Sequence, residues 1–215
     1  KRTNTEWNMV LLGNDINVSN VSINQDDNAT VFEDGIHILG GSSINISSCY
    51  IKCGDDCIAM TSLQGVSIDR INISDILVDS GSGNAVVIKN GLAGYTGTIS
   101  NINVDNISGN TGQIKNGGLI ITDVYGTQSI SNVNINNVSL TSGNTNQLVQ
   151  ISNALFIHGA KNVHVSNYTA NSFQKGIFIQ ESENINLSGL IIKNLGGLVT
   201  NLISPFYVED TKHLH

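Results

Sequence analysis

The sequence predicts an all-β protein folded as a parallel β-helix, a solenoid in which one chain winds through stacked turns of short strands. Three observations predict it. A strand-like pattern recurs along the chain at steps of 22 to 31 residues. Each copy alternates apolar and polar residues with period two, as a strand with one buried face does. Each copy also reaches a residue suited to a bend, so like strands would stack in parallel about 4.8 Å apart.

The first repeated strand supplies the predicted core ladder and one corner of each coil. Its copies begin at Ile16, Ile44, Ile71, Ile102, Val133, Val163 and Ile185. We expect these seven apolar side chains to stack inward. The fifth residues of the copies are Asn20, Ser48, Asp75, Asn106, Asn137, Asn167 and Gly189. Residues of these types tolerate a left-handed backbone, which predicts a corner there.

A second repeated strand advances along the chain together with the first. Its copies begin at Gly35, Cys57, Ala85, Gly118, Leu148 and Gly176. The two series together predict about seven coils and one β-helix domain over residues 1–215. A β-sandwich would need hairpin signals every 8 to 12 residues, and a leucine-rich repeat would need its own Leu and Asn framework with helical segments. Neither pattern is present.

Composition narrows the function classes. The chain carries a net charge of −7 and only 13% charged residues, so nucleic acid is not an expected partner. No apolar run approaches the ~18 residues that span a bilayer, and no membrane partner is expected. Nine Asn-x-Ser/Thr triplets occur. Most are expected at one place in the repeat, which favours corner residues over glycosylation sites.

Two adjacent aspartates in "KCGDDCIAM" are the main functional signal. Aligning the apolar residues of "FEDGIHI" with those of "GDDCIAM" places Asp34 over Asp56 one coil away, with Asp55 beside them. Such crowding should raise at least one pKa, because like charges this close cannot all ionise cheaply. A protonated acid beside ionised carboxylates is what hydrolysis of a glycosidic bond requires.

A calcium site or a stack of solvated turn aspartates is the structural alternative. Three oxygens would fill less than half of a calcium shell, and no Asp-x-Asp-x-Asp loop occurs. We therefore predict a hydrolytic cluster without a metal. In an inverting hydrolase at least one pair of carboxylates would lie ~6.5 to 9.5 Å apart.

"EDGIHI" and "GDDCIAM" resemble the motif pair Asn-Thr-Asp-Gly-x-Asp and Gly-Asp-Asp-Cys of the family 28 glycoside hydrolases, the polygalacturonase family. "EWNMVL" resembles the family's Pro-x-Trp-His segment, and the resemblance spans roughly residues 5–140. It implies a single-stranded right-handed parallel β-helix. It also implies an inverting reaction without a cofactor, in which Asp55 is the general acid while Asp34 and Asp56 activate water. The family carries further coils and a cap before this point, so we expect the chain to lack them.

Several positions depart from the family. "GNA" stands where the family has Gly-His-Gly, and "IIT" replaces Arg-Ile-Lys, so Ile120 and Thr122 stand in place of the cations that hold a substrate carboxylate. The substrate is therefore expected to differ from plain polygalacturonate. Lys89, one coil earlier, is a candidate substitute for the lost lysine. The candidate substrate-binding residues are His37, Asn84, Lys89, Thr122 and Gln150; Phe178 and Gln180 could extend the same groove.

The cysteines fit no family pairing. The family bonds the Cys after Asp-Asp to one before its His motif, and the corresponding stretch "LVDSGSG" has none. Cys49 is expected in the core, while a bridge between Cys53 and Cys57 stays open. Trp7 is expected in core or cap packing rather than as a sugar platform.

Three functions remain from the sequence. The first is a secreted or extracellular hydrolase of a pectin-like or other uronate or neutral glycan. The second is a polysaccharide-binding or depolymerase module of a phage tail spike or fibre. Such a module would be a homotrimer, whereas the hydrolase would be a monomer. The third is a catalytically inactive scaffold or adhesin. Periplasmic or virion-associated locations are the alternatives to secretion.

Overall fold

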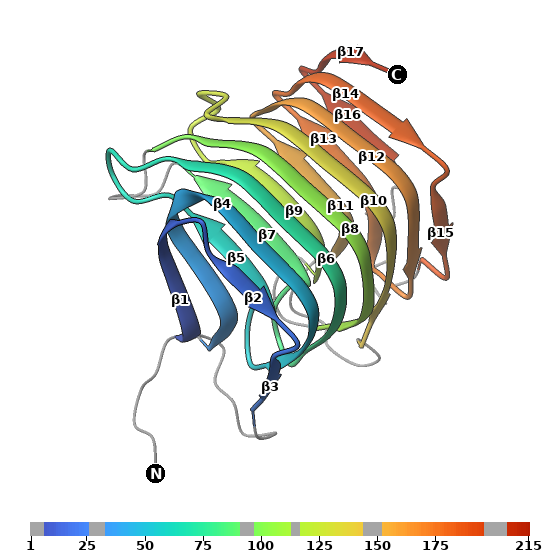
Figure 1. Cartoon of the computed structure of the whole chain (residues 1–215). Coiled ribbons are helices and arrows are strands. Elements are labelled where there is room, and N and C mark those ends of the chain that lie inside the picture. Colours follow the sequence, from blue (N-terminus) through green and yellow to red (C-terminus); the bar gives the residue numbers. More distant parts are fainter. Residues whose placement is uncertain (1–6, 26–32, 91–96, 113–116, 144–151, 196–205) are drawn as a thin grey trace.

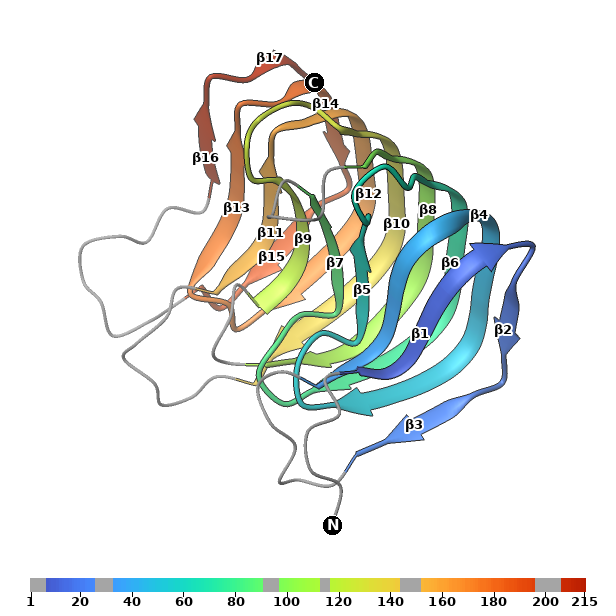
Figure 2. The same cartoon turned by 90° about the vertical axis from the view of Figure 1, so that its left-hand side faces the viewer.

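A computed structural model describes residues 7–25, 33–90, 97–112, 117–143, 152–195 and 206–215. The described chain is all-β and forms a parallel solenoid of about six turns, close to the seven predicted. Figures 1 and 2 show the strands stacked coil on coil, with the sequence advancing steadily from one end of the solenoid to the other. None of the described elements is a helix, so none is a helical membrane span.

The strands of the described residues all join one parallel sheet that wraps around the solenoid. They are β1 (Trp7–Asn14), β2 (Asn17–Ser19), β3 (Ser22–Asn24), β4 (Asp34–Cys53), β5 (Ile58–Thr61), β6 (Ile68–Ser80), β7 (Val86–Asn90), β8 (Ile99–Thr111), β9 (Gly117–Asp123), β10 (Ile130–Ser142), β11 (Asn153–His158), β12 (Ala160–Asn171), β13 (Lys175–Gln180), β14 (Glu183–Ser188), β15 (Ile191–Lys193), β16 (Phe206–Glu209) and β17 (Lys212–Leu214).

The predicted core ladder is confirmed. Successive members pair directly from Ile44 to Ile185, and these six side chains are buried. Ile16 is partly buried against the same core, and its carbonyl accepts a hydrogen bond from the backbone N–H of Asn45 at 2.8 Å. The ladder continues to Leu214, which pairs with Ile185 and was not predicted.

The predicted corner is also confirmed at every position. The six non-glycine residues have φ between 52° and 58°, and Gly189 has φ 60°. A second left-handed corner precedes the first in each coil and was missed. It consists of Asp15, Ser43, Arg70, Asn101, Asn132, Asn162 and Asn184, with φ between 53° and 56°. Arg and Ser carry no strong signal for this conformation, which hid the repeat.

The Asn-x-Ser/Thr triplets fall at two places, so the expectation of one shared place is wrong. Asn20, Asn106, Asn137 and Asn167 form corners, whereas Asn17, Asn45 and Asn72 follow the ladder residue on the strand. The amide of Asn45 donates to Asn17 at 2.9 Å, and that of Asn72 donates to Asn45 at 3.0 Å. These side chains therefore bond coil to coil. Asn28 lies outside the described residues.

The second strand series forms the site sheet, which consists of β1, the start of β4, β5, β7, β9, β11, β13 and β16. Its register follows the prediction from Ile36 through Ile58 and Val86 to Leu119. The fifth member is wrong, however. Leu155 of β11, rather than a residue of "LVQIS", pairs with Leu119 and Ile177. Both segments alternate with period two, so the pattern did not separate them.

Candidate active site

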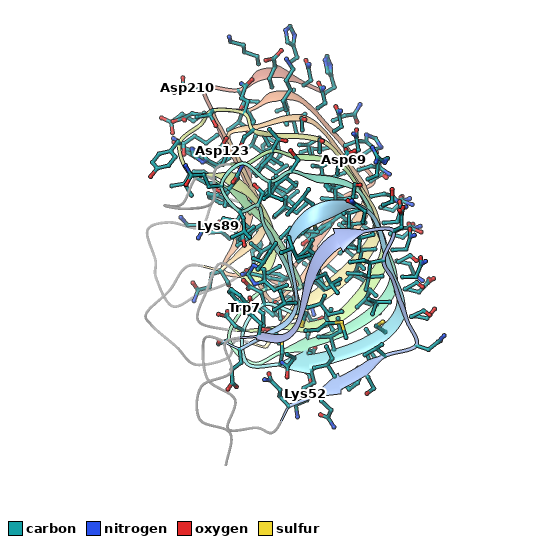
Figure 3. All side chains as sticks on the ribbon, turned by 60° about the vertical axis from the view of Figure 1, so that its left-hand side comes forward. Trp7, Lys52, Asp69, Lys89, Asp123 and Asp210 are labelled. Atoms are coloured by element: carbon teal, nitrogen blue, oxygen red, sulfur yellow. The ribbon has the colours of Figure 1, made fainter. Side chains whose placement is uncertain are left out.

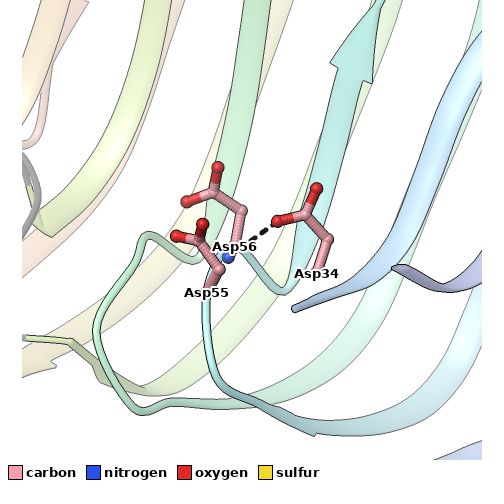
Figure 4. Close-up of side chains that lie close together, drawn as sticks. All are labelled: Asp34, Asp55 and Asp56. Carbon is pink, nitrogen blue, oxygen red and sulfur yellow. Dashed lines mark hydrogen bonds between the residues drawn. The ribbon is translucent and has the colours of Figure 1, made fainter. Parts of the chain in front are cut away.

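Three carboxylates meet where β4 begins and where β4 turns into β5. Asp34 is the first residue of β4, and Asp55 and Asp56 lie in the turn. The backbone N–H of Gly35 donates to the carbonyl of Asp56 at 2.9 Å, and that of Asp56 donates to Asp34 Oδ1 at 3.3 Å. Figure 4 shows the three carboxylates on the same side of the chain. The predicted register of Asp34 over Asp56 is therefore present.

The carboxylates are crowded and shielded from water. Asp34 is 5% exposed, Asp55 is 4% exposed and Asp56 is half-buried. Burial, followed by the charges of Asp55 and Asp34, raises the pKa of Asp56 to about 7, although hydrogen bonds from Asn84 oppose the rise. The expectation that crowding raises at least one pKa is confirmed at Asp56. The assignment of Asp55 as proton donor stays a prediction.

Oxygens of the three carboxylates approach one another closely. One oxygen from each of the three residues lies within 4.8 Å of the others. These nearest oxygens are closer than the ~6.5 to 9.5 Å expected between the acid and base of an inverting hydrolase. Such a group could also hold a cation, but three carboxylate oxygens supply at most half of the six to eight ligands that calcium takes.

Asn84 is a direct partner of the cluster. Its backbone N–H and its side-chain amide both donate to Asp56 Oδ1, at 2.9 and 2.7 Å. Asn84 is buried, and its Oδ1 has no hydrogen-bond partner in the part of the chain that the structure describes. The amide that was predicted to bind substrate therefore holds a catalytic candidate in place.

His37 also contacts the cluster. Nδ1 lies 2.7 Å from Asp34 Oδ2, and Nε2 lies 2.6 Å from Thr61 Oγ1. The ring is buried and lies 4.3 Å from the ring of Trp7 between centroids, with the planes tilted by 48°. Both ring nitrogens thus have protein partners. The residue predicted to bind substrate therefore contacts the carboxylate cluster, and Trp7 packs beside the site.

Two residues that were not predicted, Ser80 and Gly83, shape the turn around Asp55. A Cβ on Gly83 would lie 2.5 Å from Asp55 Oδ1 and 2.6 Å from Asp56 Oδ1, so only glycine fits there. Ser80 Oγ donates to the carbonyl of Asp55 at 2.6 Å and accepts from the N–H of Gly83 at 2.8 Å. The "SGSGN" stretch carried the signal, because closely spaced glycines mark close backbone approach.

The other candidate binding residues lie further along the site sheet. Lys89 pairs with Thr61 on one side and with Thr122 on the other, as the alignment predicted, and both Lys89 and Thr122 are half-buried. Thr61, the partner of Lys89 in the preceding coil, is also the residue whose hydroxyl contacts His37. Gln150 lies outside the described residues.

The cysteines lie beneath the turn that carries the aspartates. All three thiols are free and buried, which confirms the core position of Cys49. Cys53 Sγ lies 3.6 Å from Cys57 Sγ. Burial, with a smaller contribution from Cys53, raises the pKa of the Cys57 thiol, which disfavours the reactive thiolate.

Comparison with known proteins found one matching family model and a similar solved structure. The sequence model of the family described as Glycosyl hydrolases family 28 matches residues 3–142. Among solved structures, a family 28 exopolygalacturonase from Yersinia enterocolitica is similar to this chain, with a TM-score of 0.56 and 14% sequence identity over 85% of this chain. The alignment spans 38% of that protein's length. A comparison with curated proteins found no match.

The raised pKa of Asp56 predicts a pH-dependent stability. Between the ordinary pKa of 3.8 and the folded value of about 7, the folded chain keeps a proton that the unfolded chain has lost. The contribution of Asp56 to the free energy of unfolding is therefore fully present below about pH 4 and is lost as pH rises through about 7. Asp56→Asn, whose Oδ1 can still accept from Asn84, should gain free energy of unfolding relative to the parent chain over that range.

Urea unfolding at several pH values measures the difference. Asp210→Asn removes an exposed carboxylate far along the chain and is the control. A difference between Asp56→Asn and the parent chain that stays constant from pH 4 to pH 8 would contradict the assignment of the raised pKa to Asp56.

Proposed function

We propose that this chain, which belongs to glycosyl hydrolases family 28, hydrolyses a glycosidic bond of a polysaccharide at Asp34, Asp55 and Asp56. The observation that carries the proposal is the convergence of three carboxylates from two adjacent coils, one of which has a pKa of about 7. Such a group changes charge in the neutral range, as a catalytic acid or base must.

The roles follow from the environment of each carboxylate and from the family pattern. Asp55 donates its proton to the glycosidic oxygen as the bond to the anomeric carbon breaks. Asp34 and Asp56 accept a proton from a water molecule, whose oxygen forms the new bond to that carbon. Asp34 suits the base role, because a backbone N–H and His37 contact its two oxygens and hold the carboxylate in one orientation.

The substrate is proposed to differ from plain polygalacturonate. Ile120 is buried and Thr122 is uncharged, so these two positions offer no charge-assisted bond to a sugar carboxylate. Lys89, in the preceding coil, pairs directly with Thr122 and places a cation beside it. A uronate recognised by Lys89 would bind near that residue, and the sugar at the cleaved bond would not need a carboxylate.

Replacement of the proton donor is the first test. Asp55→Asn keeps the shape of the side chain, so the chain should fold while turnover falls by at least ~100-fold. New reducing ends released from a panel of polysaccharides measure the effect, with a chelator present in a parallel assay. Near-normal turnover by Asp55→Asn would refute the mechanism, as would loss of parent turnover in the chelator. Binding of a polysaccharide without cleavage by the parent chain would favour the adhesin function instead.

A substrate with an activated leaving group identifies which carboxylate is the acid. Such a substrate needs no protonation, so it should restore much of the rate to Asp55→Asn and little to Asp56→Asn. The reverse result would move the proton donor to Asp56, whose raised pKa makes it the competing candidate.

We propose inversion of configuration from family membership, because the short spacing of the nearest oxygens does not argue for it. Proton NMR recorded early in the reaction should show a product anomer opposite in configuration to the cleaved bond. Retention would instead indicate that one carboxylate attacks the sugar directly.

His37 is proposed to position Asp34 rather than to bind sugar. His37→Gln removes the bond to Asp34 Oδ2, so kcat should fall by roughly 10- to 100-fold while KM changes little. Thr61→Val, which removes only the anchor of the ring, should show a smaller fall of the same kind. A rise in KM with unchanged kcat would instead support the predicted substrate contact.

A further inference from the structure

We infer that the site sheet carries a second carbohydrate-binding surface, which we call the distal strip. It consists of an aromatic row and a polar row on β11, β13 and β16: Phe156, Phe178 and Tyr207, with His158, Gln180 and Glu209. The ligand we assign to it is a run of neutral, hydroxyl-rich sugar residues of the polysaccharide. This inference rests on the proposed function for the identity of the chain that is bound.

The aromatic row is a continuous stack. Phe156 pairs with Phe178, and Phe178 pairs with Tyr207, so the three rings occupy one outward position in consecutive coils. Ring centroids lie 5.0 and 4.7 Å apart, with interplanar angles of 10° and 13°. Nearly parallel rings at these separations overlap only in part, which leaves some of each face uncovered. Tyr207 is 40% exposed, and both phenylalanines are partly exposed.

The polar row runs beside the rings, two residues further along each strand. Glu209 Oε2 accepts from the hydroxyl of Tyr207 at 2.8 Å and from Gln180 Nε2 at 3.1 Å. His158 Nε2 lies 3.4 Å from Glu181 Oε2. An aromatic surface flanked by amide, imidazole and carboxylate groups offers a sugar ring both an apolar contact and partners for its hydroxyls.

The charged residues near the distal strip restrict which sugars it is expected to bind. Glu209 and the neighbouring Glu181 and Asp210 place carboxylates along the strip, while Lys89 lies nearer the three aspartates. A uronate would meet repulsion at the strip, whereas a neutral sugar would not. The occupant is therefore expected to lack carboxylates where it crosses β13 and β16.

The strip lies on the same sheet as the candidate active site and follows it along the solenoid. The polar row continues without a register shift from Thr61 through Lys89 and Thr122 to His158. In Figure 3, Trp7, Lys89 and Asp210 follow one another on one side of the molecule. From the coil of Asp56, the strip begins three strand spacings away and ends five away, which is roughly 14 to 24 Å. A polysaccharide lying along the axis would reach both places.

A binding assay in the Asp55→Asn background tests the strip without cleavage of the ligand. Affinity electrophoresis through gels that contain neutral polysaccharides or polygalacturonate measures retardation. Replacing Phe178 and Tyr207 with Ala should weaken retardation by a retained neutral polysaccharide by about 10-fold or more. Leu77→Ala is the control, because Leu77 is 50% exposed and lies on β6, outside the site sheet.

Unchanged retardation of the double variant would overturn the inference, as would an equal loss in Leu77→Ala or no retardation by any neutral polysaccharide. If the double variant fails to fold, Gln180→Ala and Glu209→Gln test the polar row. The inference would also be overturned if both of these variants were retarded as strongly as the parent. In the cleaving chain, the double variant should raise KM for long chains and leave kcat on short oligosaccharides unchanged.

The two proposals fail in different ways. Strip-dependent retardation without any cleavage by the parent chain would keep the strip and refute the hydrolase. Cleavage by the parent chain, together with retardation that the strip variants leave unchanged, would keep the hydrolase and refute the strip.

Discussion

The register between successive coils is the constraint on which the rest of the molecule depends. Parallel pairing places the same repeat position over itself once per turn, so the apolar ladder from Ile44 to Ile185 remains inside. A slip of one residue would turn every buried side chain of a strand outward. Two left-handed corners five residues apart recur from coil to coil, from Asp15 and Asn20 to Asn184 and Gly189, and side-chain hydrogen bonds such as that from Asn72 to Asn45 tie neighbouring coils together.

The candidate active site follows from that register. Asp34 belongs to one coil and Asp56 to the next, and the same backbone bonds that join the coils bring their carboxylates together. The arrangement costs free energy, because three acids share a small and shielded volume. Asn84, which lies in the following coil, offsets part of this cost by donating twice to Asp56. Three consecutive coils therefore contribute to one electrostatic unit.

The departures from the family pattern change the surroundings of the acids more than the acids themselves. Asn84, in the place of a histidine, bonds Asp56, and His37, in the place of an aspartate, bonds Asp34. Ser80 occupies the stretch where the family has a cysteine and holds the Asp55 turn by hydrogen bonds. The same scaffold thus keeps the carboxylates while their polar partners differ.

The sequence by itself determined the repeat, the inward ladder, one corner of each coil and the overlap of Asp34 with Asp56. These features are periodic, and period-two alternation with left-handed corner residues can be read along a single chain. Only the tertiary structure decided the strand at β11, because "LVQIS" and "NALFIH" share the same alternation and only the pairing of Leu155 with Leu119 and Ile177 separates them. It also decided that His37 is buried against Thr61, that Asn84 bonds Asp56 and that Gly83 must be small. Each of these contacts joins different coils, so it depends on how the coils superimpose rather than on any local pattern.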